Sequence, residues 1–373
     1  MNRLYYLDNL MLFLSILVVL HHVSIGYGIM GNWSYVTAEK LTSSIQIFFS
    51  ALFGLEASFS MSLFFFISAY LTIPSLEKKG ISKFLKGRFI RLVIPLLFVM
   101  IILAPTILFY VERHNKTTAL SWFSYVLQQN ISNPNTSHTW FILVLLSFEL
   151  VYIFYWKFIK PNFSISNNLP GKITQLRILT VIILCGVLTV LSRQLFPPGQ
   201  SFIGIQFFNM TPYIFMYAAG LLVYRKQWLD DLSGKLARTW FLIALVAALY
   251  FCWIIYNLSK QTRLGNKFVS GLNLESVSLA FAQTLICVGF SGFLLHLFKN
   301  KFNFTNFTLS KMRENRYGVY ILHSAVVVAV TVLLEFLSLN PIIKYGIACI
   351  LSVVFSFMLV ALIRQVPFVK KVI

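Results

Sequence analysis

Residues 7–28 read LDNLMLFLSILVVLHHVSIGYG and decide the class of the fold. The run is almost wholly apolar, and it has the length of about 20 residues that a bilayer-spanning helix needs. It also contains two adjacent histidines, His21 and His22. Polar side chains are expensive to bury in hydrocarbon, so their presence inside a span indicates a functional site. The stretch therefore predicts a membrane-spanning helix that contributes polar side chains to a functional site.

One face of this helix gathers several non-aliphatic side chains. At 100° per residue, Asp8, Met11, Ser15 and His22 fall on nearly one stripe, whereas His21 points about 100° away. A rise of 1.5 Å per residue places His22 about 21 Å from Asp8 along the axis. We therefore expect the rest of the chain to bring a substrate to His22.

The composition of the whole chain is typical of a polytopic membrane protein. Hydrophobic residues make up 58% of the 373 residues and charged residues only 11%, whereas soluble domains carry about 25% charged residues. The net charge of +20 comes from short basic runs between apolar segments. Such runs indicate topogenic charges and contacts to headgroups or phosphates, not nucleic-acid binding. Four cysteines lie inside apolar runs without pairing or metal spacing, which indicates packing roles: Cys185, Cys252, Cys287 and Cys349.

Apolar runs bounded by charged residues, Pro and Gly predict ten spans. The connection at 111–138 contains ALSWFSYVLQ, which predicts an interfacial or re-entrant segment packed over the site. The predicted fold is all-α, with residues 1–373 forming a single membrane-embedded domain and no appended soluble domain. The expected spans lie near residues 8–29, 54–73, 91–110, 139–157, 176–195, 206–224, 239–257, 274–297, 316–337 and 341–363.

The distribution of Lys and Arg sets the expected orientation. With both termini in the cytoplasm, 23 of the 31 basic residues fall on the cytoplasmic side. The loop 258–273 is the exception, with three basic residues outside. The sequence thus predicts a multi-pass protein of the plasma (inner) membrane with both termini cytoplasmic.

The densest basic cluster is PSLEKKGISKFLKGRFIR at residues 74–91, before the third expected span. Arg88 and Arg91 are three residues apart and so share a helix face. They stand at a helix N-terminus, which already favours anions, and arginine forks bind phosphate oxygens bidentately. Residue type alone leaves two interpretations open: positive-inside charge with lipid headgroups, or a phosphate-bearing cytosolic ligand.

The fourth expected span contains a second intramembrane ionisable residue. Glu149 lies about ten residues below the outer end of the span and eleven residues after His138, on the same face. Its expected depth is similar to that of His22. A carboxylate beside that imidazole would fix its tautomer, as a general base requires. The alternatives are a protonated packing residue or a pair with another polar group.

The ninth expected span begins with a polar face. Arg316, Tyr320 and His323 lie on that face, with Arg316 at the cytoplasmic mouth. We interpret them as a second wall of the polar channel, with helix-packing hydrogen bonds as the alternative. On the outer side, Trp33 and Tyr35 follow the first span and are either sugar contacts or residues of an aromatic belt. Polar residues also flank the loop between the fifth and sixth spans: Arg193, Gln194, Gln206 and Asn209.

Common nucleotide, hydrolase and metal motifs do not occur in the sequence. There is no Walker loop, GxGxxG fingerprint, GxSxG elbow or HExxH pair. His21, His22 and His323 lack a matching ligand set at metal spacing, so no metal site is predicted.

Six pieces of the chain resemble the integral-membrane acyltransferase family 3 (acyltransferase 3), and they follow in family order across nearly the whole length. The likeness is to the bacterial branch similar to glucan succinyltransferase and sugar O-acetyltransferases. The matching pieces are LDNLMLFLSILVVLHH (7–22), MSLFFFISAYL (61–71), PSLEKKGISKFLKGRFIRLVIPLLF (74–98), TWFILVLLSFELVY (139–152), PYIFMYAAGLLVYRKQWLD (212–230) and RYGVYILH (316–323).

The resemblance implies transfer of an acyl group, usually acetyl, from cytosolic acyl-CoA to a hydroxyl of an extracytoplasmic or lipid-linked sugar or polysaccharide. The family's essential first-span histidine falls on His22, and its arginine pair falls on Arg88 and Arg91. One departure is Met11, where members usually carry Arg or Lys. Arg3 or Lys86 are the expected substitutes.

These observations give the expected site. His22 is the general base and Glu149 orients it. Acyl-CoA, most simply acetyl-CoA, is the donor substrate, and no cofactor or metal stays bound. A transporter or flippase for a saccharide, and a non-catalytic scaffold, are the alternative functions. The remaining expected contacts are Arg88, Arg91, Lys86, Arg316, Tyr320 and His323 for the donor, and Trp33, Tyr35, His138 and Trp140 for the acceptor.

Overall fold

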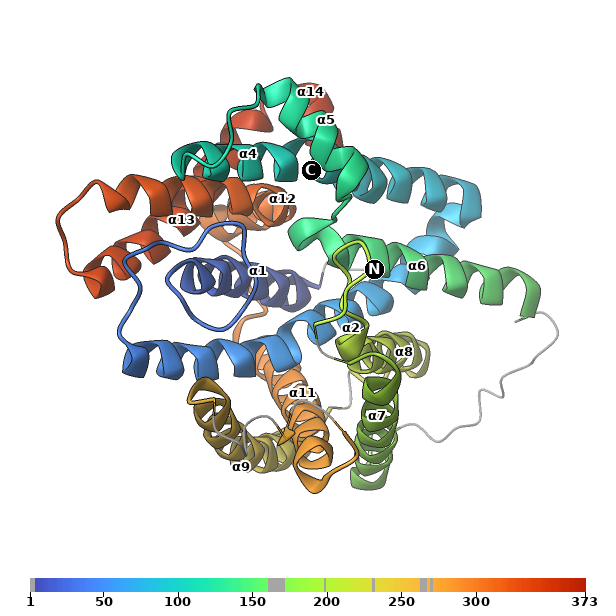
Figure 1. Ribbon diagram of the computed structural model, residues 1–373. Coiled ribbons are helices and arrows are strands. Elements are labelled where there is room, and N and C mark those ends of the chain that lie inside the picture. The colour runs from blue at the N-terminus through green and yellow to red at the C-terminus, as the bar shows by residue number, and fades with distance from the viewer. Residues whose placement is uncertain (1–3, 160–171, 198, 230–231, 262–266, 269–270) are drawn as a thin grey trace.

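The computed structural model describes residues 4–159, 172–197, 199–229, 232–261, 267–268 and 271–373 (Figure 1). These residues are mainly helical, as the sequence predicts. The helices are α1 (Tyr5–Gly26), α2 (Ser43–Arg88), α3 (Ile94–Phe98), α4 (Ala104–His114), α5 (Trp122–Ser132), α6 (Trp140–Phe154), α7 (Gln175–Leu195), α8 (Met210–Lys226), α9 (Gly234–Ser259), α11 (Leu274–Lys301), α12 (Phe307–Glu335), α13 (Pro341–Ile363) and α14 (Pro367–Val372).

Nine helical segments in the described part of the chain are long and apolar enough to cross a membrane. The second and third expected spans, 54–73 and 91–110, both lie in one helical run of 72 residues, Ser43–His114. A straight helix of this length would measure about 108 Å, against a hydrocarbon core of about 30 Å. The run bends at Gly80, where φ is 71° and ψ is 165°. Glycine adopts this conformation readily because it has no Cβ, and the bend separates the two expected spans.

The quoted N-terminal stretch forms the centre of the bundle. In Figure 1, α1 is surrounded by α2, α11, α12 and α13, and it contacts all four. In both α1 and α12, 67% of the apolar window is buried inside the structure, against 22–44% for the other candidate spans. A helix enclosed on all sides has no solvent-facing stripe. This enclosure explains why the first 20 residues of α1 are apolar all round except for a few polar groups.

Helices α2 and α8 approach each other closely. A Cβ added at Gly220 of α8 would lie 2.2 Å from the carbonyl oxygen of Phe66 and 2.9 Å from Cβ of Ala69 in α2. Small residues that allow backbones to approach are a common device of membrane helix packing. Gly220 therefore fixes the position of α8.

We expect Gly220→Ala to lower the free energy of unfolding by about 1–3 kcal/mol, because the added methyl group overpacks this contact. Gly292→Ala in α11 is the matched control, since nothing lies within 4 Å of its added Cβ. The control should be neutral or slightly stabilising. Unfolding of both variants in mixed micelles measures the effect, and equal stabilities would contradict the close α2–α8 contact.

Candidate active site

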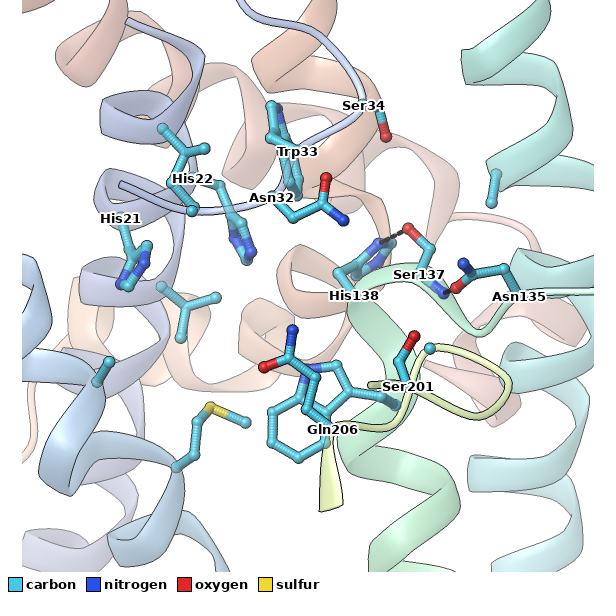
Figure 2. A pocket seen from close by; sticks show the side chains of 18 of the residues that line it. His21, His22, Asn32, Trp33, Ser34, Asn135, Ser137, His138, Ser201 and Gln206 are labelled. Atoms are coloured by element: carbon cyan, nitrogen blue, oxygen red, sulfur yellow. Dashed lines mark hydrogen bonds between the residues drawn. The ribbon is translucent and has the colours of Figure 1, made fainter. Parts of the chain in front are cut away.

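A cavity of about 560 Å³ lies at the end of α1 that is farther from the N-terminus (Figure 2). Its walls come from α1, α2, α4, the start of α6, the start of α8, α12 and the loops between them. The lining mixes imidazole, indole, amide and hydroxyl groups with a few apolar side chains. Its polar and aromatic residues include His21, His22, Asn32, Trp33, Glu56, Asn135, Ser137, His138, Trp140, Gln206, Asn209, Tyr213 and Tyr320.

His22 reaches this cavity from the last turns of α1. Its Nδ1 lies 3.0 Å from Nε2 of His323 on α12. The indole of Trp33 stacks on the His22 ring with a centroid distance of 4.1 Å, and Figure 2 shows the two side by side. The structure thus brings together three residues that the sequence singled out. Packing and hydrogen bonding hold the His22 ring in one orientation.

A third histidine enters from the short helix Ser137–Thr139 before α6. Nε2 of His138 lies 3.0 Å from the carbonyl oxygen of Ile321, and the Tyr320 hydroxyl donates to the carbonyl of His138 at 2.7 Å. These two bonds join the start of α6 to the middle of α12. Tyr320 and His323 were expected to contact the donor. Tyr320 lines the cavity, whereas His323 is buried behind it, against the rings of His22 and His138.

The other histidine of the pair, His21, has a carboxylate partner. Its Nδ1 lies 2.7 Å from Oε2 of Glu56 in α2, and both residues line the cavity. Glu56 is not among the residues that the sequence pattern singled out. Its signal was nevertheless present, because Glu56 is an acidic residue inside an apolar run, the same criterion that identified Glu149.

Glu149 does not reach His22. Its Oε1 lies 2.7 Å from Nη2 of Arg88 and 3.2 Å from the Thr72 hydroxyl, and the residue is 2% exposed. The predicted Glu149–His22 pair is wrong because the depths differ. Trp140 lines the cavity, whereas Glu149 lies nine residues farther along the helix, about 14 Å away. The structure instead agrees with the alternative interpretation, in which Glu149 pairs with another polar group.

The basic residues expected to bind the donor lie toward the N-terminal end of α1. Arg88 turns inward to Glu149, while Lys86 and Arg91 are exposed. Arg91 belongs to a π-helical turn, Phe89–Val93. The i→i+5 bonding of this turn changes the spacing that predicted a shared face with Arg88.

Arg316 lies beside the position where the family usually has a basic residue. Its Nη2 is 3.1 Å from Oδ1 of Asp8 and 4.0 Å from Sδ of Met11. A guanidinium from α12 therefore occupies the neighbourhood of Met11 in space, although not in sequence. Lys86 was one expected substitute, and Arg3, the other, lies outside the described residues.

Tyr35 differs from the other expected acceptor contacts. It is buried in an apolar cluster with Ile107, Val111 and Val328, and its ring meets that of His114 edge-on. The structure thus gives Tyr35 a packing role. Trp33, His138 and Trp140 do line the cavity, as do two of the flanking amides, Gln206 and Asn209.

Among the described residues, no group of three or more His, Cys, Asp or Glu is arranged to hold a metal ion.

Comparison with known proteins relates this arrangement to one family. The sequence profile of an acyltransferase domain matches residues 4–361. Glucans biosynthesis protein C of Escherichia coli K12 is 28% identical over 188 residues, covering 49% of this chain but only 46% of that protein. The protein of the same name from Escherichia coli O157:H7 is 26% identical over 306 residues, 76% of each chain. No solved structure matches. Because the profile spans nearly the whole chain, this membrane protein belongs to the acyltransferase 3 family.

Proposed function

We propose that the protein transfers an acyl group from acyl-CoA to a hydroxyl of a glucan-type saccharide on the outer side of the membrane. The observation that carries the proposal is the position of His22. Its ring faces a polar cavity at one end of a central helix, and basic side chains gather toward the other end. The name of the Escherichia coli relatives supports a glucan as acceptor.

The donor would enter at the basic end. Arg88, Arg91, Arg316 and Lys86 supply cationic groups for the phosphates of CoA, and guanidinium groups suit phosphate oxygens well. Met11, beside Arg316, precedes His22 by eleven residues of helix, about 17 Å. An extended pantetheine arm covers this distance and would place the thioester beside His22.

The acceptor would occupy the cavity. Sugars present both hydroxyl groups and apolar ring faces, and the lining offers counterparts for each. Trp33 and Trp140 provide aromatic surfaces, while Asn32, Asn135 and Gln206 provide amide donors and acceptors. A few convergent polar groups within a concave site are the usual basis of small-molecule recognition.

The chemical step follows from these positions. His22 Nε2 takes the proton of the acceptor hydroxyl as the oxygen attacks the thioester carbonyl. The new C–O bond forms, the C–S bond breaks, and the CoA thiolate takes up the proton from the imidazolium. Acetyl and succinyl groups both satisfy this chemistry, so the acyl group has to be measured.

The test uses the purified full chain with acetyl-CoA or succinyl-CoA and a linear glucan. We expect thiol release that depends on the glucan, together with a glucan whose mass has grown by the transferred acyl group. A saccharide carrier without acyl chemistry would move the glucan across vesicle membranes and release no thiol. That result would overturn the proposal.

Arg316 gives a separate prediction about the donor. Arg316→Ala should raise the KM for acyl-CoA by about 10–100-fold with little change in kcat, because a hydrogen bond to a charged group contributes about 1.5–3 kcal/mol. Lys311→Ala, on the exposed side of the same helix, is the control and should leave KM unchanged. If both variants had the same KM for acyl-CoA, Arg316 would not be part of the donor site.

A further inference from the structure

The partner of the His22 ring is a second histidine and not a carboxylate. His323 is fully buried, and its Nε2 lies 3.0 Å from Nδ1 of His22. The two acids that are buried in the described part of the chain pair with other side chains, Glu56 with His21 at 2.7 Å and Glu149 with Arg88 at 2.7 Å. The protonation pattern of His22 is therefore set by His323 together with the backbone carbonyl of Val18, to which the His22 ring also bonds.

The other nitrogen of His323 faces two backbone carbonyl groups. Its Nδ1 lies 2.8 Å from the oxygen of Tyr320 and 3.2 Å from that of Val319. A carbonyl oxygen only accepts, so Nδ1 of His323 must carry a hydrogen. In the neutral imidazole Nε2 then holds a lone pair, and it must accept from Nδ1–H of His22. Nε2 of His22 is left unprotonated.

We infer that His323 is a positioning residue, which holds His22 in the tautomer whose Nε2 lone pair is available to a substrate in the cavity. The inference rests on the proposed function for its catalytic meaning. In serine hydrolases a buried carboxylate does this task by accepting from Nδ1–H of the base. Here a backbone-anchored imidazole takes the place of that carboxylate.

The neutral partner also changes what happens to the transferred proton. When Nε2 of His22 takes the acceptor's proton, Nδ1–H of His22 becomes more acidic and can pass its proton to Nε2 of His323. The positive charge then lies on His323, whose Nδ1–H still donates to the Tyr320 carbonyl. Return of this proton allows His22 to protonate the CoA thiolate, so no net proton is gained or lost.

Two substitutions separate this role from simple packing. His323→Leu removes the acceptor, whereas the amide oxygen of His323→Gln reaches toward the place of Nε2 and can accept from His22. We expect His323→Leu to lower kcat by about 10²–10⁴-fold, as for loss of the orienting residue in a catalytic triad. The KM for acyl-CoA should not change, and His323→Gln should restore kcat to within about tenfold of wild type. His296→Leu, which alters a histidine whose ring is hydrogen-bonded to the side chain of Asn300, is the control.

The tautomer itself can be read without any activity. In protein labelled with ¹⁵N-histidine, the signals that disappear in His22→Ala belong to His22, and we expect a protonated Nδ1 and an unprotonated Nε2. This measurement needs only the wild type and His22→Ala, so it holds even if His323→Leu does not fold.

Two results would overturn the inference: a His22 protonated at Nε2 in the neutral enzyme, or a folded His323→Leu variant with the kcat of wild type. Failure of the proposed function appears differently, as a wild-type protein that transfers no acyl group. In that case the NMR signals of His22, compared between the wild type and His323→Leu, decide whether His323 sets the tautomer.

Discussion

His22→Ala is expected to lower the rate of acyl transfer by about 10²–10⁴-fold, the contribution of a positioned general base. Binding of acyl-CoA should be unchanged, because the phosphates would be held toward the other end of α1. The ring lines the cavity, and its contacts include the stacked Trp33, the hydrogen bond to His323 and a hydrogen bond with the backbone of Val18. Truncation therefore enlarges a polar cavity and does not open an apolar core.

The adjacent histidine provides the control. His21 also lines the cavity, but its Nδ1 is bonded to Glu56 and not to His323. His21→Ala should reduce transfer far less than His22→Ala. Thiol release and acyl-CoA binding, measured for both variants, decide the assignment. If His21→Ala removed transfer and His22→Ala did not, the Glu56–His21 pair would be the base in place of His22.

The second large effect concerns the ion pair of Arg88 and Glu149. Arg88→Ala should lower the free energy of unfolding by about 3 kcal/mol, because it leaves a buried carboxylate without its cation. We choose the lower end of the range for buried pairs, since the Arg88 side chain is 26% exposed. Glu149→Leu alone should destabilise by a similar amount. The double variant Arg88→Met/Glu149→Leu should recover most of the loss, since replacing both charges with apolar groups is often neutral.

Two measurements keep the stability and donor roles of Arg88 apart. Unfolding in mixed micelles reports the ion pair, and a binding titration reports acyl-CoA. The double variant should be stable yet bind acyl-CoA weakly. Lys86→Ala is the control because Lys86 is exposed, and it should change stability by at most about 0.5 kcal/mol. If the loss of stability in the double variant equalled the sum of the losses in the two single variants, the Arg88–Glu149 ion pair would be contradicted.

The sequence predicts the helices well because bilayer thickness and helical periodicity act locally. All ten expected spans overlap the nine candidate membrane helices, and the α1 stretch becomes the central helix. The difference in number arises at Gly80, where a helical run continues through a bend instead of ending. The acyltransferase 3 resemblance is also confirmed, by a profile match over residues 4–361. The cytoplasmic location of both termini remains a prediction.

The pairing of side chains could not be predicted in the same way. His22 meets His323 across 301 positions of sequence, and Arg316 reaches Met11 across 305. Helical spacing says which face a residue occupies but not which distant helix lies against that face. Glu149 illustrates this limit. Its depth, reckoned from the ends of two helices, suggested His22 as its partner, whereas the packing of α2 against α6 places Arg88 beside it.

The most direct measurement places donor and acceptor on opposite sides of a membrane. Vesicles containing the purified protein enclose a linear glucan, and labelled acyl-CoA is added outside. We predict that protein molecules inserted with their basic end outward will label the glucan inside sealed vesicles. With His22→Ala we predict no labelled glucan. The account would be contradicted if the protein acylated glucan in permeabilised vesicles but left the glucan enclosed in sealed vesicles unlabelled. In that case the acyl group would not pass from a donor bound at one side of the membrane to an acceptor at the other.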